Sequence, residues 1–169
     1  SGAIGDKIGR KPSIIYAGLI FSAGVLLQVV TSAFLSIFLI GRLIAGVGIG
    51  LLSGLVPVYQ AECSPKKIRG ALIATYQLAI TIGIELSNIV NTFTRNYMDA
   101  RSYRIPIGLQ FVFTAVLLLG MFIVPESPRY LYSKGKEHEA AEAILYVRKT
   151  KAMTKEIQEE LSEIGYDIE

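Results

Sequence analysis

The sequence predicts an all-α integral membrane protein with four membrane-spanning helices and short amphipathic helices after them. Hydrophobic residues make up 51% of the chain and charged residues only 18%, whereas a soluble domain has about a quarter of its residues charged. No charge occurs at residues 13–41 or 43–61. The charges are also segregated, with 11 basic and 5 acidic residues in 1–129 but 6 basic and 9 acidic residues in 130–169.

One crossing of the hydrocarbon core needs about 20 apolar residues. We therefore divide the chain into a cytoplasmic loop at 1–13, spans at about 14–30, 37–59, 71–93 and 105–124, and a cytosolic segment at 125–169. In this last segment Ile144, Ile157, Leu161 and Ile164 belong to apolar patterns with helical spacing among charged residues, which predicts amphipathic helices. The alternative, a large soluble helical core, would leave too little polar surface.

Basic residues indicate the orientation. They lie before the first span, between the second and third spans, and after the fourth span: Lys7, Arg10, Lys11, Lys66, Lys67, Arg69, Arg129, Lys134 and Lys136. The positive-inside rule then predicts that both ends of the chain are cytoplasmic. Arg95, Arg101 and Arg104 in the opposite loop run against this assignment, and Asp99 offsets them in part.

The third span carries a polar stripe. At about 100° per residue, its members fall within about 40° of one line: Gln77, Thr81, Ile84, Asn88 and Asn91. Glu85 lies at the edge of this stripe. Polar groups inside a bilayer face protein or a water-filled path, so the stripe favours a solute pathway over the alternative, helix–helix hydrogen bonding in a closed bundle.

The second span contains Arg42 and a glycine series. Arg42 either reaches the outer interface or pairs with an acid on a neighbouring helix, and Glu85 is the one candidate in this chain. Gly46, Gly50 and Gly54 recur at every fourth position, which predicts close helix packing in lipid. A dinucleotide-binding loop does not fit, because such loops lie between a strand and a helix.

No arrangement of residues suggests catalysis. The single histidine, His138, lies in the charged tail, and the single cysteine, Cys63, excludes an internal disulfide. The sequence has no phosphate-binding loop, metal-ligand cluster or nucleophile elbow. We therefore expect neither an enzyme, nor a cofactor or metal, nor a nucleic-acid partner.

Four motifs carry a family resemblance. Residues 2–11, of the form G-x-x-x-D-K-x-G-R-K, resemble the loop between the second and third helices of major facilitator superfamily transporters. Three further segments are similar to the sugar porter family: Gly41-Arg42 with residues 59–70, residues 103–110, and Pro-Glu-Ser-Pro-Arg-Tyr-Leu at 125–131. Their sequences resemble fungal hexose transporters most closely. These motifs occur in the family's order and cover nearly the whole chain.

The resemblance implies that the spans are helices three to six of twelve, followed by the intracellular helical domain. It assigns sugar binding to Gln77, Ile84 and Asn88, and proton coupling to Arg42 through an acid on the absent first helix. It also implies a cytoplasmic charge network that latches the two halves of the transporter, formed by Asp6, Arg10, Glu62, Arg69, Glu126 and Arg129.

The function so implied is transport of a monosaccharide by alternating access, as a proton symporter or a facilitator, in the plasma membrane. The partners would be a sugar, H⁺, the lipid bilayer and the missing C-terminal half, and we expect this fragment alone to be inactive. Two alternatives stay open. One is a carrier for a polyol, quinate or inositol, and the other is a truncated membrane protein that associates with full-length transporters.

Overall fold

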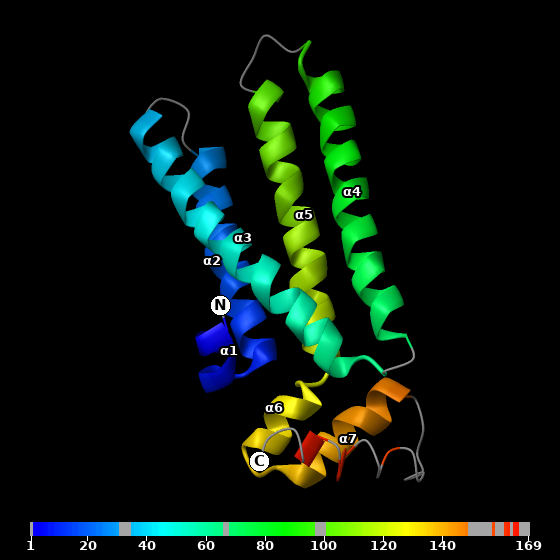
Figure 1. The fold of residues 1–169 in the computed structure, drawn as a ribbon. Coiled ribbons are helices and arrows are strands. Elements are labelled where there is room, and N and C mark those ends of the chain that lie inside the picture. Colours follow the sequence, from blue (N-terminus) through cyan, green and yellow to red (C-terminus); the bar gives the residue numbers. More distant parts are fainter. Residues whose placement is uncertain are drawn as a thin grey trace.

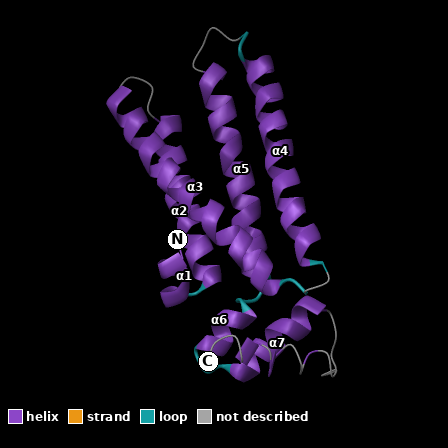
Figure 2. Cartoon of the chain, viewed as in Figure 1, coloured by secondary structure: helices purple, strands orange, loops and turns teal. Residues whose placement is uncertain are grey.

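The computed structural model describes residues 2–30, 35–65, 68–96 and 101–148, and single residues or pairs from 157 to 165. Within these ranges the chain is helical and no strand occurs (Figure 2). The helices are α1 (Gly2–Ile8), α2 (Arg10–Val30), α3 (Leu35–Cys63), α4 (Arg69–Thr94), α5 (Arg101–Ile123), α6 (Pro128–Ser133) and α7 (Glu137–Arg148). Lys66, Lys67, Asp99 and residues 31–34 lie outside the described residues. The gap predicted between the first two spans, residues 31–36, is shorter in the structure, because α3 begins at Leu35.

Four of the described helices, α2 to α5, are long and apolar enough to cross a membrane. Their most apolar windows have mean hydropathies of 2.0, 2.2, 1.3 and 2.1 in that order, which confirms the predicted all-α fold with four membrane helices. Residues 2–8, predicted as loop, form α1, because the Asp6–Arg10 ion pair supports its last turn and α3 packs against it.

The long helices run side by side, and the short helices α1, α6 and α7 gather at one end of them (Figure 1). We call this the junction end and the opposite end the open end. Helices α2 and α3 form the most extensively packed pair in the described chain, and α5 lies against α2. Helix α4 stands at the side of the bundle and contacts α5 and α3 less extensively.

Small residues bring α2 and α3 together. A Cβ atom on Gly24 would lie 2.8 Å from the Gly41 carbonyl oxygen and also clash with the Ala45 amide, and a Cβ atom on Gly48 would lie 2.7 Å from the backbone nitrogen of Phe21. The predicted packing of Gly46 and Gly50 is wrong for this chain, because nothing lies within 4 Å of a Cβ atom at either position. The close approach uses the other face of α3.

Two apolar clusters join α2, α3 and α5. The first, toward the junction end, consists of Ile14, Leu55, Tyr59 and Met121, and the second consists of Phe21, Val25, Ala45 and Ile107. Neither cluster includes a residue of α4. Thr94 is the one buried residue that α4 contributes among those described, so almost the whole surface of α4 is free within this chain.

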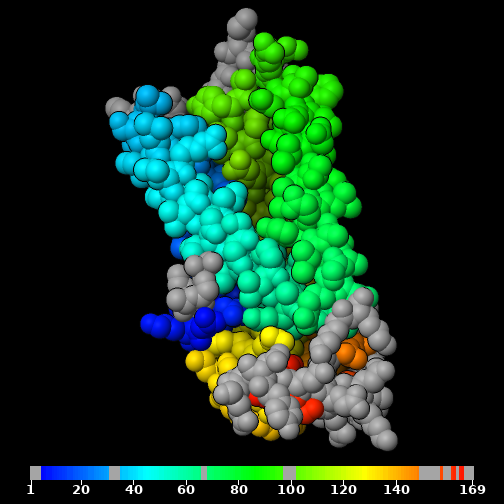
Figure 3. Space-filling model, viewed as in Figure 1, coloured from blue at the N-terminus to red at the C-terminus, as the bar shows by residue number. Residues whose placement is uncertain are grey.

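A groove separates α4 from α5. Its volume is about 470 Å³, and most of its lining is apolar: Ala79, Ile82, Gly83, Leu86, Ser87, Val90, Pro106, Leu109, Gln110 and Phe113. Figure 3 shows the same loose arrangement from outside, with α5 visible at the bottom of a hollow between α3 and α4.

Candidate functional site

A sharp turn at Gly9 brings the motif residues of the junction end together. Gly9 has φ 115°, in the left-handed region that favours glycine. A Cβ atom here would also lie 2.6 Å from Glu126 Oε2 and 3.2 Å from Pro12. The turn ends α1 and starts α2, so Asp6 and Arg10 face one another across it.

Arg10 is the centre of an ion cluster. Its Nη2 atom lies 2.7 Å from Asp6 Oδ1 and 3.1 Å from Glu62 Oε1. Its Nε–H also donates to Glu62, at 3.4 Å from Oε2, so Arg10 and Glu62 form a two-pronged pair. The side chains of Arg10 and Glu62 are only 13% and 14% exposed, whereas Asp6 is 64% exposed. The Arg10–Glu62 pair is therefore the protected part of the cluster.

Glu62 extends this cluster to α6. The Ser127 hydroxyl donates to Glu62 Oε2 at 2.6 Å and accepts from the Tyr130 amide at 3.4 Å. Ser127 is fully buried and caps the N-terminus of α6, which Pro128 then begins. The Tyr59 hydroxyl adds a second link, since it donates to the Pro125 carbonyl at 2.5 Å. One end of α3 is thus fastened to the segment between α5 and α6.

The ends of α2 and α5 cap each other. Glu126 Oε1 accepts from the backbone amides of Lys11 and Ser127, both at 2.9 Å. Lys11 Nζ donates in return to the Val124 and Phe122 carbonyls, at 2.8 and 3.2 Å. The first amides and last carbonyls of a helix lack partners within the helix. Glu126 therefore serves the start of α2, and Lys11 serves the end of α5.

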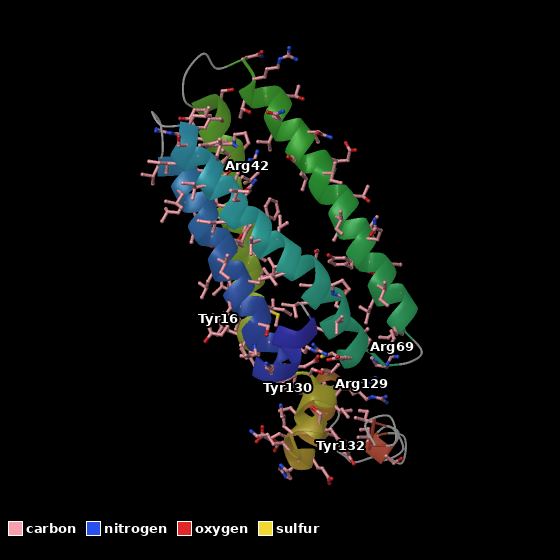
Figure 4. The ribbon with its side chains drawn as sticks, turned by 60° about the vertical axis from the view of Figure 1, so that its left-hand side comes forward. Tyr16, Arg42, Arg69, Arg129, Tyr130 and Tyr132 are labelled. Carbon is pink, nitrogen blue, oxygen red and sulfur yellow. The ribbon has the colours of Figure 1, made fainter. Side chains whose placement is uncertain are left out.

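The predicted charge network is thus partly assembled in this chain. Asp6, Arg10 and Glu62 are in direct contact, and Arg129 lines the same cleft of about 290 Å³ together with Tyr130 and Ser133. Figure 4 shows Arg69 and Arg129 at this end of the molecule.

Two residues of the predicted network, Glu126 and Arg69, make no ion pair with its other members among the described residues. Glu126 bonds to backbone amides, as described above. Arg69 begins α4, and its buried Nε has no hydrogen-bond partner among the described residues. Sequence reasoning missed Lys11, Tyr59 and Ser127, which all lie in the quoted motifs. Their partners include backbone carbonyls and amides, which a motif does not reveal. A latch between two halves stays a prediction.

The polar stripe of α4 faces away from the rest of the chain. Its five members, Gln77, Thr81, Ile84, Asn88 and Asn91, are all exposed. The Thr81 hydroxyl donates to the Gln77 carbonyl at 3.1 Å, within the helix itself. The side chains of Gln77, Asn88 and Asn91 make no hydrogen bond among the described residues, so closed-bundle hydrogen bonding does not account for the stripe within this chain.

Arg42 lies toward the open end of α3 and is exposed (Figure 4). Its guanidinium carbon is 5.9 Å from the centre of the Phe38 ring, a cation–π contact. In the described part of the chain Arg42 makes no ion pair, and Glu85 is not its partner there. Interfacial exposure and an acid outside this chain both stay open as explanations.

Solved structures define the class of protein to which this fold belongs. The chain is similar to the xylose transporter XylE from E. coli in a partially occluded inward-open conformation, with a TM-score of 0.85 and 27% identity, covering 98% of this chain and 42% of that one. A structure described as the major facilitator superfamily proton:xylose symporter XylE bound to 6-bromo-6-deoxy-D-glucose gives a TM-score of 0.87 and 27% identity, covering 99% of this chain and 39% of that one. The four long helices and the junction are thus arranged as in a major facilitator superfamily transporter.

The family follows from sequence. Residues 1–169 match the family described as "Sugar (and other) transporter", and the chain belongs to that family, which is a family of transporters and not of enzymes. It is 44% identical to the high glucose sensor RGT2 of Saccharomyces cerevisiae, over 98% of this chain and 22% of the relative. It is also 44% identical to the probable glucose transporter rco-3 of Neurospora crassa, over 95% and 27%.

The low-affinity glucose transporter HXT3 of S. cerevisiae is 37% identical, over 98% of this chain and 29% of the relative. The chain therefore spans between about a fifth and a third of the length of the curated relatives it matches. The resemblance to fungal hexose transporters that the motifs predicted is confirmed.

Proposed function

We propose that this chain forms part of the first half of a carrier that moves a monosaccharide across a membrane by alternating access. The observation that carries this proposal is the exposed polar stripe of α4, on a helix of membrane length. Such groups are tolerated in a bilayer where they face protein or water. A sugar offers many hydroxyl groups, and the free amides of Gln77 and Asn88 can both donate to and accept from hydroxyls.

The relatives support the substrate class. Two of them are named as glucose transporters, and the solved neighbour XylE was crystallised with a glucose analogue. We assign Gln77, Ile84 and Asn88 to the wall of the sugar path, with the opposite wall supplied by segments outside this chain. The junction end would be cytoplasmic, as the positive-inside rule indicates, and the plasma membrane is the expected location.

A Gln77→Ala exchange in the full-length protein that contains this chain tests the proposal. Loss of a hydrogen-bonding amide from a solute site costs about 1 to 1.5 kcal/mol, so the KM for glucose uptake should rise about five- to tenfold. The measurement is uptake of radiolabelled glucose in cells without their own hexose carriers, with the amount of protein at the surface held equal. Gly83→Ala, in the groove on the opposite face, is the matched control and should leave the KM unchanged.

A second candidate function is sugar sensing, because the relative RGT2 is named a glucose sensor. A sensor binds the sugar without moving it at a useful rate. Saturable glucose binding without uptake would favour this candidate. If the Gln77→Ala variant kept wild-type affinity for glucose and for polyols, Gln77 would not belong to the sugar site, whether the protein is a carrier or a sensor.

A further inference from the structure

Glu85 is an ionisable residue that neither the apolar packing nor the stripe explains. It lies within α4, 16 residues after Arg69 and nine before Thr94, which at 1.5 Å per residue is about 24 Å and about 14 Å from the two helix ends. Long Lys and Arg side chains near the ends of a membrane helix can extend to the interface, but the short side chain of a glutamate this far from both ends cannot. Its carboxylate must therefore find its partner at its own level in the membrane.

The direction in which Glu85 points follows from helix geometry. At about 100° per residue, Glu85 lies about 80° from the middle of the polar stripe and about 130° from the middle of the side that lines the α4–α5 groove. Leu86, the next residue, lines that groove, while Glu85 does not. Thr81 and Asn88, four residues before and three after it, are its neighbours on the helix surface. Glu85 thus widens the polar stripe on one side.

The described part of this chain offers Glu85 no partner. The side chain is exposed, and among the described residues it makes no ion pair or hydrogen bond. Helices α3 and α5 are the described elements that contact α4 most extensively. The α5 groove residues in this region are Pro106, Leu109, Gln110 and Phe113, none of them cationic.

We infer that Glu85 is a specificity-determining hydrogen-bond acceptor in the solute path, where it selects solutes that present an O–H or N–H donor at its level. This inference rests on the proposed transport function. A carboxylate is an acceptor with two oxygens, so it suits adjacent hydroxyls of a sugar, and it binds the ammonium group of an amino sugar more tightly. A lipid-facing position would give the carboxylate no such partner.

Cysteine accessibility tests the position of Glu85. In the full-length protein, with other reactive cysteines removed, Glu85→Cys should react with a membrane-impermeant charged thiol reagent, and glucose should slow the reaction. Leu86→Cys, on the groove side, is the matched control and should not react. Gln77→Cys reports independently on the solute path. Labelling at Gln77→Cys without labelling at Glu85→Cys overturns the inference and leaves the proposed function intact, whereas labelling at neither position counts against both.

Substrate discrimination tests the role of the charge. Uptake of glucose is measured in competition with glucosamine, at mildly acidic pH where its amine is protonated, and with uncharged 2-deoxyglucose. Even a well-hydrated ion pair at about 4 Å corresponds to about fivefold in affinity, so Glu85→Gln should weaken glucosamine relative to 2-deoxyglucose at least about fivefold. Glu85→Gln keeps the shape and one acceptor oxygen but removes the charge, so an unchanged ratio overturns the inference even where Glu85→Cys is labelled.

Discussion

The junction end and helix α4 satisfy their polar groups in opposite ways. At the junction, Arg10, Glu62 and Ser127 bond to one another in a region shielded from solvent. On α4, the side chains of Gln77 and Asn88 are exposed and unbonded within the described chain. Both regions are rich in polar residues, so composition does not distinguish them.

The difference teaches which polar residues support the fold and which are available to a ligand. A buried polar group that loses its partner destabilises the protein, because it keeps the cost of leaving water. An exposed group with no partner inside the chain contributes little to stability and can be exchanged cheaply. Substitutions at the junction should therefore lower stability, whereas substitutions in the polar stripe of α4 should change transport alone.

Removal of Glu62 should have the largest effect. Glu62→Ala removes the shielded carboxylate that pairs with the Arg10 guanidinium and also removes the acceptor of the buried Ser127 hydroxyl. Breaking a shielded charge pair by removing one partner costs about 3 kcal/mol or more. We expect a lowered midpoint of thermal unfolding for the full-length protein in detergent.

An exposed ion pair provides the control for Glu62. The distance from Lys136 Nζ to Glu139 Oε1 is 2.9 Å, but the two side chains are 54% and 53% exposed. Surface pairs contribute about 0 to 1 kcal/mol, so Lys136→Ala should leave the midpoint nearly unchanged. Equal shifts for Glu62→Ala and Lys136→Ala would show that the junction is not a protected network.

The mutual capping of α2 and α5 should give an intermediate effect. Glu126→Ala removes the acceptor of the Lys11 and Ser127 amides, and loss of a cap costs about 1 kcal/mol. Glu126→Gln keeps an oxygen at that position, so it should recover most of the stability. The measurement is the free energy of unfolding of the three proteins in the same detergent.

Comparison of Glu126→Ala with Glu126→Gln also distinguishes two roles for Glu126, a helix cap and a charged latch between the two halves. A latch between two halves depends on the negative charge, whereas a cap depends on the acceptor oxygen. If Glu126→Gln is as unstable as Glu126→Ala, the charge matters and the capping account fails.

The long helices were predictable because their signal is local. Uncharged runs such as residues 13–41 indicate a membrane helix without knowledge of any neighbour. Which face of a helix meets its partner is not local, and for this reason Gly46 and Gly50 were assigned to packing that Gly41 and Gly48 perform. All four glycines lie in one helix, and only the position of α2 distinguishes them.

The same limit applies to the candidate site. The motifs placed Asp6, Arg10 and Glu62 in one network, and the structure brings these three into contact. The motifs could not show that Glu126 bonds to backbone amides, because any residue can supply an amide. The proposed sugar contacts of α4 would need an opposite wall from segments outside this chain, so the sequence and the fold of this chain define only one side of that site.

Arg42 should give the smallest effect on stability and a distinct effect on transport. It is exposed and contacts the Phe38 ring, and such a cation–π contact at an exposed site is worth about 0.5 to 1 kcal/mol. If the complete carrier couples sugar to protons through Arg42, Arg42→Ala should abolish sugar accumulation driven by a pH gradient and leave exchange of sugar across the membrane in place. The measurement compares accumulation with exchange in proteoliposomes.

Phe38→Leu serves as the matched variant for Arg42, because it removes the ring but keeps the guanidinium. It should retain accumulation if the charge of Arg42 is what matters. Intact accumulation in Arg42→Ala would remove Arg42 from coupling and favour the interfacial explanation. A carrier that shows no accumulation even in the wild type would be a facilitator, and in it Arg42→Ala should leave the distribution of sugar across the membrane unchanged. Arg42 therefore resembles the polar stripe of α4 and not the junction, because its charge has no ion-pair partner in the described part of this chain.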